Sequence, residues 1–218
     1  MIDVYVWNPI GAAGGVFGRS VGHGAMLVLP DPARPERGRY ISWWPLAVGA
    51  LEASLNVGVR PYPNTWSEDL RDMGRPPDFC WMLNRTGTDF DETAIMRAWD
   101  AEASRVPLWS AGNRANPEYR ALDRNCCSTV MNLLFGPGGG ARYRTYGPIP
   151  LTWWNPNDVN AWMEGAVTRG LALGISPAPP PPGGVPAFGR SHLEGPEADR
   201  LTELGRRLAT RAPPRPRR

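Results

Sequence analysis

The sequence predicts a protein of the α+β class. Apolar residues that alternate or run together between turn formers predict strands at residues 2–7, 22–29, 39–44 and 79–83. Capping residues and helical apolar spacing predict helices at residues 66–73, 89–105, 125–135 and 155–163. A chain of 218 residues that is 42% hydrophobic and 21% charged can bury one good core or two small ones.

The strands have individual signatures. In residues 2–7, Ile2, Val4 and Val6 alternate with Asp3, Tyr5 and Trp7, which predicts an edge or half-buried strand. Pro30 and Pro45 close the next two strands, and the turn between them spans residues 31–38. Residues 79–83 are continuously apolar and predict a buried strand.

Two segments near these strands carry no regular pattern. Residues 8–20 are rich in glycine but lack the Gly-Lys-Ser/Thr ending of a phosphate-binding loop. We therefore expect a loop over a cleft. Residues 46–66 carry several turn formers and are expected to be irregular.

Three of the helices begin and end at recognisable residues. The helix at residues 66–73 ends at Gly74. Asp89 and Glu92 have the spacing of a capping box, and the apolar pattern after them continues to about residue 105. Asn155 and Pro156 suit the cap and the first position of the last helix.

The helix at residues 125–135 carries two adjacent thiols. Asn125 suits its N-cap, and Gly136-Pro137 ends it. One buried face is predicted from the spacing of Cys127, Val130, Met131 and Leu134. Cys126 falls beside that face at the positive end of the helix dipole, where a thiolate is stabilised. Cys126 is thus the candidate nucleophile and Cys127 a packing residue, although a lone cysteine is usually a small buried hydrophobe.

A thiol nucleophile needs an imidazole to take its proton and deliver it to the leaving group. The chain has two histidines. His192 follows the proline-rich segment and is poorly placed for a core site. His23 opens a predicted strand between Gly22 and Gly24, which allow another backbone or a substrate to approach closely. His23 is therefore the candidate base.

Composition excludes several classes of protein. No apolar run approaches the roughly 20 residues that span a bilayer, and the N-terminus lacks the basic region of a signal peptide. All 24 basic residues are arginine, which suits a GC-rich genome, and several lie in the last thirteen residues. We therefore expect no nucleic-acid binding. Three cysteines and two histidines without ligand spacing predict neither a disulfide framework nor a metal site, and we expect no cofactor.

We expect residues 1–174 to form the folded domain. Residues 175–218 are expected to be a Pro/Gly-rich linker and an Arg-rich tail, with a short amphipathic helix around residues 195–210.

Four short motifs resemble those of one enzyme group in kind and order. They are residues 22–27 (Gly-His-Gly-Ala-Met-Leu), 40–45 (Tyr-Ile-Ser-Trp-Trp-Pro), 125–130 (Asn-Cys-Cys-Ser-Thr-Val) and 156–159 (Pro-Asn-Asp-Val). Together they resemble the permuted papain-like cysteine enzymes, which include the NlpC-type peptidases and the lecithin:retinol acyltransferase-like enzymes. The sequences of the four motifs most resemble those of the Rho-inactivation domains of bacterial toxins and of type VI secretion effectors. The resemblance covers roughly residues 1 to 168 and not the tail.

This resemblance implies a permuted papain-like fold, with a small antiparallel sheet packed on the helix that carries the nucleophile. It assigns Cys126 as the nucleophile and His23 as the base, with the backbone N–H of Cys126 in the oxyanion hole. The orienting residue remains open. Effector relatives place an acid after the Trp-Trp-Pro strand, which favours Asp69 and leaves Asp72 as an alternative. Other branches use the strand after the histidine, where Ser42 is the polar residue.

The expected function is cysteine-dependent acyl transfer, as an amide or peptide hydrolase or an acyltransferase. Expected partners are a protein, peptide or peptidoglycan substrate, together with an immunity or secretion partner if the chain is a bacterial effector or toxin. As synthesised the chain is expected to be cytoplasmic, with export through a specialised system as the effector alternative. The alternative hypothesis is that the chain is an inactive binding or adaptor module of the same fold. We expect Cys126→Ala and His23→Ala to abolish activity and Cys127→Ala largely to keep it.

Overall fold

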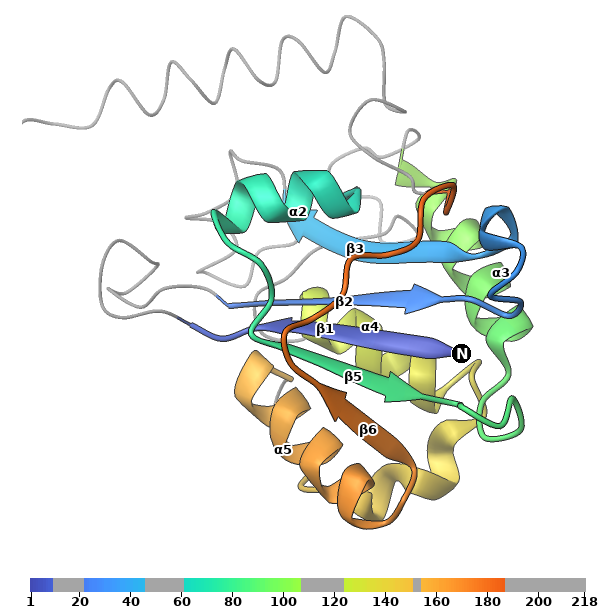
Figure 1. The fold of residues 1–218 in the computed structure, drawn as a ribbon, viewed down its shortest axis with the longest axis vertical. Helices are drawn as coiled ribbons and strands as arrows, with labels where there is room; N and C mark the ends of the chain where they lie inside the picture. Colours follow the sequence, from blue (N-terminus) through green and yellow to red (C-terminus); the bar gives the residue numbers. More distant parts are fainter. Residues whose placement is uncertain (10–21, 46–60, 107–123, 151–153, 187–218) are drawn as a thin grey trace, which may run out of the picture.

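The computed structural model describes residues 1–9, 22–45, 61–106, 124–150 and 154–186. It is an α+β structure built on one six-stranded antiparallel sheet in the order β4-β3-β2-β1-β5-β6. Figure 1 shows the strands from β3 to β6 side by side. The strands are β1 (Ile2–Trp7), β2 (His23–Val28), β3 (Arg39–Pro45), β4 (Pro61–Pro63), β5 (Phe79–Leu83) and β6 (Ala172–Ile175). A short 3-10 helix, η2 (Pro35–Arg37), lies in the turn between β2 and β3.

Strand β1 lies in the middle of the sheet, so the expectation of an edge or half-buried strand was wrong. It pairs with β2 on one side and with β5 on the other. All six of its residues are buried. The alternating Asp3, Tyr5 and Trp7 suggested a solvated face, but that face is covered by a second layer of the protein.

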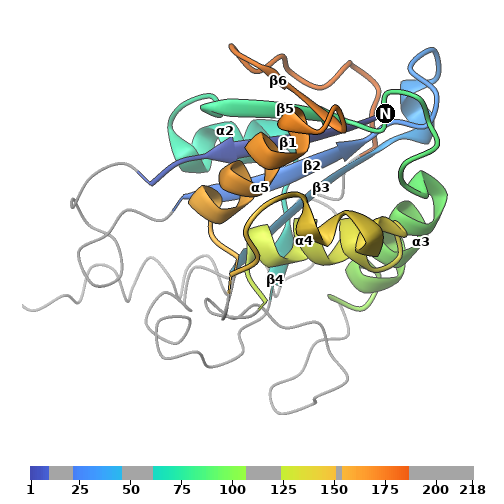
Figure 2. The same cartoon turned by 90° about the horizontal axis from the view of Figure 1, so that it is seen from below.

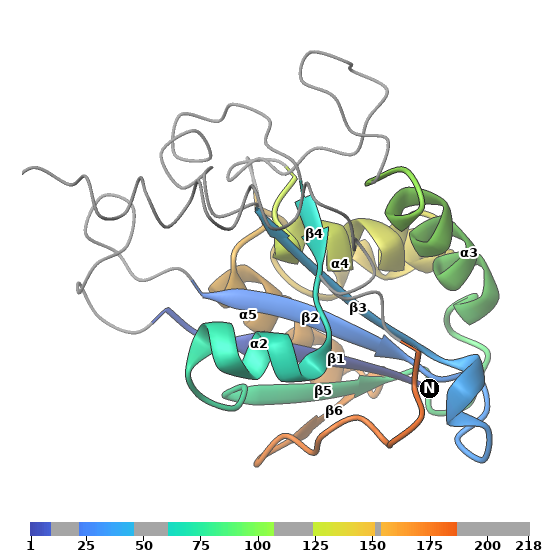
Figure 3. The same cartoon turned by 90° about the horizontal axis from the view of Figure 1, so that it is seen from above.

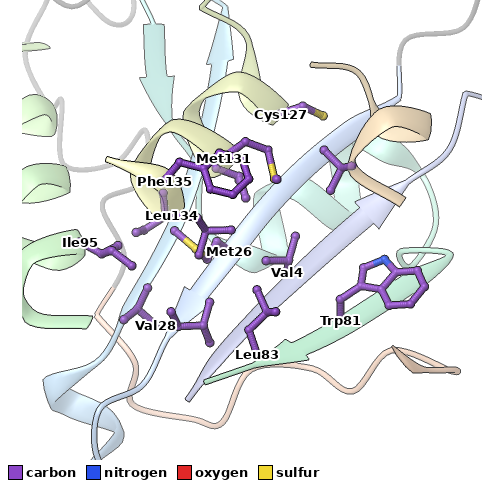
Figure 4. Packing of buried hydrophobic residues seen from close by; sticks show 14 of the residues in the cluster. Val4, Met26, Val28, Trp81, Leu83, Ile95, Cys127, Met131, Leu134 and Phe135 are labelled. Atoms are coloured by element: carbon purple, nitrogen blue, oxygen red, sulfur yellow. The ribbon is translucent and has the colours of Figure 1, made fainter. Parts of the chain in front are cut away.

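Three helices cover one face of the sheet (Figure 2). They are α3 (Glu92–Ala103), α4 (Cys126–Phe135) and α5 (Pro156–Thr168). Helix α4 packs across β2 and β3, and α5 packs against β6 and β1. The predicted face of α4 is confirmed, because Cys127, Val130, Met131 and Leu134 are all at most 1% exposed. Figure 4 shows Met131 and Leu134 beside Met26, Val4 and Val28 of the sheet.

The opposite face of the sheet carries α2 (Trp66–Met73), as Figure 3 shows. Beneath it lies a second apolar cluster that contains Tyr5, Trp7 and Tyr40, with Trp66 of α2 packed against it. Residues 176–186 cross this face, and Ala178 and Val185 pack against the same cluster. The Tyr40 backbone N–H donates to the Pro186 carbonyl at 3.4 Å. The first part of the segment expected to be a linker therefore packs on the sheet.

The helix boundaries follow their caps. Helix α2 occupies the predicted residues, and Asn125 and Asn155 cap α4 and α5 as expected. Helix α3 starts later than predicted, with Asp91 as its cap. The reason is that Asn84 Oδ1 accepts from the backbone N–H groups of both Asp89 and Phe90, which holds these residues in a turn.

Strands β4 and β6 and the 3-10 helix η5 (Gly140–Tyr146) were not predicted. Strand β4 is Pro-Tyr-Pro, β6 contains Gly174 and η5 starts at a glycine, and these residue types are typical of turns. Most of the predicted loop at residues 8–20, residues 46–60 of the segment expected to be irregular, and the helix at 195–210 lie outside the described residues. The end of that irregular segment was wrongly predicted, because Pro61–Pro63 form β4 and Trp66 begins α2.

One buried carboxylate in β1 lacks a full set of partners. Asp3 is 5% exposed, and its Oδ1 atom has no hydrogen-bond partner within the described structure. Burial raises the pKa of Asp3 from its ordinary value of 3.8 to about 6, against a smaller lowering by the N-terminal ammonium. The folded state therefore holds this proton more tightly than the unfolded state. Its stabilising contribution is present below pH 4 and is lost as the pH rises through about 6.

We expect Asp3→Asn to increase the free energy of unfolding at pH 8 by about 2 kcal/mol, because the variant removes the cost of burying an ionised carboxylate. Urea unfolding at pH 4.5 and pH 8 measures this. The gain should shrink at pH 4.5, where wild-type Asp3 is protonated. Glu164→Gln, at an exposed position on α5, is the control and should give the same small change at both pH values. A gain from Asp3→Asn that is independent of pH would contradict this explanation.

Candidate active site

The first turn of α4 holds Cys126 at its N-terminus. Asn125 caps the helix, and its Oδ1 accepts from the Ser128 backbone N–H at 2.8 Å. The Asn125 amide donates to the Trp154 carbonyl at 2.9 Å, which ties the cap to the chain before α5. Cys126 is 5% exposed. The cap therefore fixes the thiol at the positive end of the helix dipole, as the sequence predicted.

His23 is the first residue of β2, and the glycines beside it allow the close packing that the sequence predicted. A Cβ atom on Gly24 would lie 2.9 Å from Cys127 Sγ, so any larger residue would push α4 away from the strand. A Cβ atom on Gly22 would lie 2.5 Å from the Trp7 carbonyl oxygen. The pairing of β2 with β3 starts at Ala25, which leaves His23 beyond the paired residues on that side. Helix α4 can therefore bring Cys126 to the His23 ring.

Asp69 of α2 meets the far side of that ring. His23 Nε2 lies 3.2 Å from Asp69 Oδ2, and both side chains are almost completely buried, at 2% and 0% exposed. Thr65 and Glu68 form a capping box that fixes the first turn of α2 and so the position of Asp69. Because Nε2 faces the carboxylate, Nδ1 is the ring nitrogen left for the thiol. The structure brings Cys126, His23 and Asp69 together.

Four further side chains donate hydrogen bonds to the Asp69 carboxylate. Oδ2 accepts from the Tyr40 hydroxyl at 2.7 Å, and Oδ1 accepts from Ser42 Oγ at 3.0 Å. Oδ1 also accepts from Trp44 Nε1 at 2.7 Å and from Asn64 Nδ2 at 3.0 Å. Sequence reasoning missed Tyr40, Trp44 and Asn64. The available signal was the alternation of Tyr40, Ser42 and Trp44, which puts three donors on one face of β3.

The two alternatives to Asp69 occupy different places. Ser42 Oγ lies 3.1 Å from His23 Nε2, and because its hydroxyl proton goes to Asp69, its oxygen is an acceptor for the ring N–H. Ser42 and Asp69 therefore contact the same ring nitrogen together. Asp72 instead accepts from Asn64 Nδ2 at 3.0 Å. Asp69 is the carboxylate that touches His23.

Two tryptophans hold the imidazole ring in place. The Trp44 ring lies 4.5 Å from the His23 ring, centroid to centroid, at an interplanar angle of 32°. The Trp7 ring lies 5.2 Å away at 45°. With Nε2 held by Asp69 and Ser42, the ring has little freedom to rotate. Its remaining nitrogen is fixed toward Cys126.

The site favours a thiolate beside an imidazolium. Burial by itself would lower the pKa of His23, but the negative charges of Asp69 and Cys126 outweigh it and raise that pKa from 6.5 to about 10. The pKa of Asp69 stays below its usual 3.8, because the charge and hydrogen bond of His23 and the donors Tyr40 and Ser42 overcome the effect of burial.

The pKa values of the two neighbouring thiols, Cys126 and Cys127, shift in opposite directions. A hydrogen bond from the Cys127 thiol is the largest influence that lowers the pKa of Cys126 well below 9.0. The charge and hydrogen bond of His23 and the Gly24 backbone N–H add to it, against burial. The pKa of Cys127 rises well above 9.0, because it donates to Cys126 and is buried. Cys127 is therefore both a packing residue and a hydrogen-bond donor to the thiolate.

No group of three or more His, Cys, Asp or Glu side chains with metal-binding geometry occurs in the described ranges. Within the same ranges, none of the helices has the length and apolar character to cross a bilayer.

The geometry supports nucleophilic chemistry by a thiolate, with a histidine to move the proton and a carboxylate to orient the histidine.

Comparison of the chain with models of known protein families, with functionally characterised proteins and with solved structures finds no match.

We expect iodoacetamide to label Cys126 rapidly at pH 7, because the His23 imidazolium keeps the thiol ionised below its ordinary pKa. His23→Ala removes that charge, so the pKa of Cys126 should rise toward 9.0 and labelling at pH 7 should slow by roughly 10-fold or more. The measurement is the labelling rate from pH 5 to 10, with the modified residue located by peptide mass spectrometry.

Two other thiols provide internal controls for this experiment. Burial raises the pKa of Cys80 to about 12, and the pKa of Cys127 is also raised. Iodoacetamide should therefore label both thiols slowly in the folded protein. Circular dichroism of His23→Ala checks that the variant is folded. If the pH profile of a folded His23→Ala protein matches that of wild type, His23 does not set the ionisation of Cys126.

Two variants at position 127 test the hydrogen bond between the thiols. Cys127→Ala should keep a reactive Cys126 but shift its labelling profile to higher pH, because the donor is lost. Cys127→Ser keeps a donor of similar size and should stay nearer to the wild-type profile. Equal profiles for the two variants would show that residue 127 acts on Cys126 only through packing.

Proposed function

We propose that this chain is a cysteine-dependent acyl-transfer enzyme with a permuted papain-like fold, acting as an amide or peptide hydrolase or as an acyltransferase. One observation carries the proposal: the buried contact of Cys126, His23 and Asp69, in which the thiol pKa is lowered and the imidazole pKa is raised. Structural cysteines buried among apolar residues instead have a raised pKa.

The topology supports the finer assignment of fold. The histidine precedes the cysteine in the chain, His23 opens an inner strand of an antiparallel sheet, and Cys126 begins a helix packed on that sheet. This arrangement agrees with the order of the four motifs that resemble the permuted papain-like enzymes. It supports residues 1–174 as a catalytic domain of that kind.

The first half of the reaction forms a thioester. The Cys126 thiolate attacks the carbonyl carbon of the substrate, and the negative charge moves to the carbonyl oxygen. The backbone N–H at the start of α4 points toward this oxyanion and stabilises it. When the carbon–nitrogen or carbon–sulfur bond breaks, the His23 imidazolium gives its proton to the leaving group. The products are an acyl-Cys126 thioester and a neutral imidazole.

The second half regenerates the enzyme. Neutral His23 takes a proton from water, or from an acceptor such as an amine, as that molecule attacks the thioester carbonyl. Collapse of the second oxyanion expels the Cys126 thiolate beside a newly protonated His23. Asp69 remains ionised throughout and orients the His23 ring. Ser42 contacts both the ring and the carboxylate and so keeps them in position.

A chromogenic ester tests this mechanism without knowledge of the natural substrate. With p-nitrophenyl acetate we expect a burst of nitrophenolate and an acetyl group on Cys126 that peptide mass spectrometry detects. Cys126→Ala should abolish the burst, and His23→Ala should slow it by roughly 100-fold. Cys127→Ala is the matched control and should keep the burst at pH 8 to 9.

Two results would overturn the proposal. Equal loss of the burst in folded Cys126→Ala and Cys127→Ala proteins would remove the distinction between the thiols. A wild-type protein whose Cys126 reacts no faster than an ordinary thiol, and whose rate is unchanged in His23→Ala, would instead support a binding or adaptor module.

A role as a bacterial effector or toxin extends this proposal and is supported by the resemblance to toxin and effector domains. If it is correct, expression in a susceptible cell should be toxic for the wild type and harmless for Cys126→Ala at the same protein level. Toxicity that persists in Cys126→Ala would separate this role from the chemistry of the site.

A further inference from the structure

A pocket of about 340 Å³ lies between α3 and α4. Trp43 of β3, Ala98 and Trp99 of α3, and Thr129 and Leu133 of α4 line it. Arg124, which precedes α4, and Pro137, which follows it, also contribute to the walls. The pocket therefore extends along the same helix that begins with Cys126.

The pocket lies on the side of α4 that carries the thiol. Cys126, Thr129 and Leu133 stand at positions i, i+3 and i+7, which places their side chains in one row along the helix. Thr129 is three residues from Cys126, or roughly 4.5 Å along the helix axis. A group bonded close to a carbonyl at Cys126 can therefore enter the pocket.

The walls match an apolar group next to a hydrogen-bond acceptor. Trp43, Ala98 and Leu133 provide apolar surface. Trp99 is 1% exposed, and its indole N–H has no acceptor among the described residues. The Arg124 side chain is exposed, and the structure gives it no ion pair among those residues. The Trp99 nitrogen itself is buried, so the Arg124 guanidinium beside apolar surface is the donor that suits a peptide better than a hydrocarbon chain.

One acidic residue also lines the pocket. Glu102 forms an ion pair with Arg105, which lies just beyond the end of α3, so its charge is partly balanced. Arg124 is therefore the charge in the wall that remains to select a ligand.

We propose that this pocket binds the substrate residue beside the reacting carbonyl, with an aliphatic side chain against Trp43 and Leu133 and a carboxylate or carbonyl at Arg124. The proposal rests on the proposed acyl-transfer function. It assigns a peptide as the substrate class. It also makes α3, which lines one side of the pocket, a determinant of substrate specificity.

Three alkylating reagents test the pocket through the rate at which Cys126 displaces their iodide. N-iodoacetyl-leucine carries an aliphatic side chain and a carboxylate, N-isopentyl-iodoacetamide carries the aliphatic group alone, and iodoacetamide carries neither. We expect wild type to react with N-iodoacetyl-leucine roughly 10-fold faster than with iodoacetamide, after correction for the intrinsic reactivity of each reagent with a free thiol.

Substitutions on α3 provide a matched pair. Ala98→Phe fills the pocket and should bring the ratio of the N-iodoacetyl-leucine rate to the iodoacetamide rate close to one. Ala101→Phe adds the same side chain at an exposed position of the same helix that does not line the pocket, and it should keep the wild-type ratio. Arg124→Gln should reduce the rate with N-iodoacetyl-leucine to that with N-isopentyl-iodoacetamide.

The outcomes separate the two proposals. Slow reaction of wild type with iodoacetamide itself would count against the acyl-transfer function. Fast reaction with iodoacetamide but no preference for N-iodoacetyl-leucine would overturn the pocket assignment alone. A preference for N-isopentyl-iodoacetamide that Arg124→Gln does not change would overturn the peptide assignment in favour of a hydrocarbon chain.

Discussion

The buried carboxylate of Asp69 is the interaction on which the site depends. An ionised carboxylate without contact with water is costly unless charge and hydrogen bonds replace the water. Asp69 receives this replacement from His23 and from donors on two other segments, which are β3 and the residue Asn64 before α2. The carboxylate thereby ties β2, β3 and α2 into one arrangement. The orientation of His23 follows from it, and through His23 Asp69 contributes to lowering the pKa of Cys126, beside the hydrogen bond from Cys127.

The second constraint is steric and acts from the other face of the sheet. Helix α4 can approach β2 only because residue 24 has no side chain, and that approach brings the start of the helix to the end of the strand where His23 lies. The electrostatic contacts hold the imidazole from one side, and the packing of Cys127 over Gly24 sets the thiol on the other. A site of this kind is built by two layers that meet at the end of one strand.

Much of the site was predictable because its residues have local signatures. Asn125 and Gly136 mark the ends of the cysteine helix, and the apolar row from Cys127 to Leu134 predicts which thiol packs in the core. The alternation of Tyr40 and Trp44 places both on one face of β3, but their contacts and that of Asn64 with Asp69 were not predictable, because the sequence does not show which element covers that face. Strand β1 was misplaced for the same reason. Its polar-looking face is covered by α2 and by residues 176–186, which are far away in the chain.

The central position of β1 has a consequence for how the protein folds. Strand β1 pairs on one side with β2 and on the other with β5, whose residues come more than seventy positions later. The outer strand β6 follows only after the cysteine helix and α5. Such pairing over long sequence distances is characteristic of slow folding. The contacts among His23, Asp69 and Cys126 likewise join segments up to about one hundred positions apart, so the influences that lower the pKa of Cys126 arise only in the folded chain.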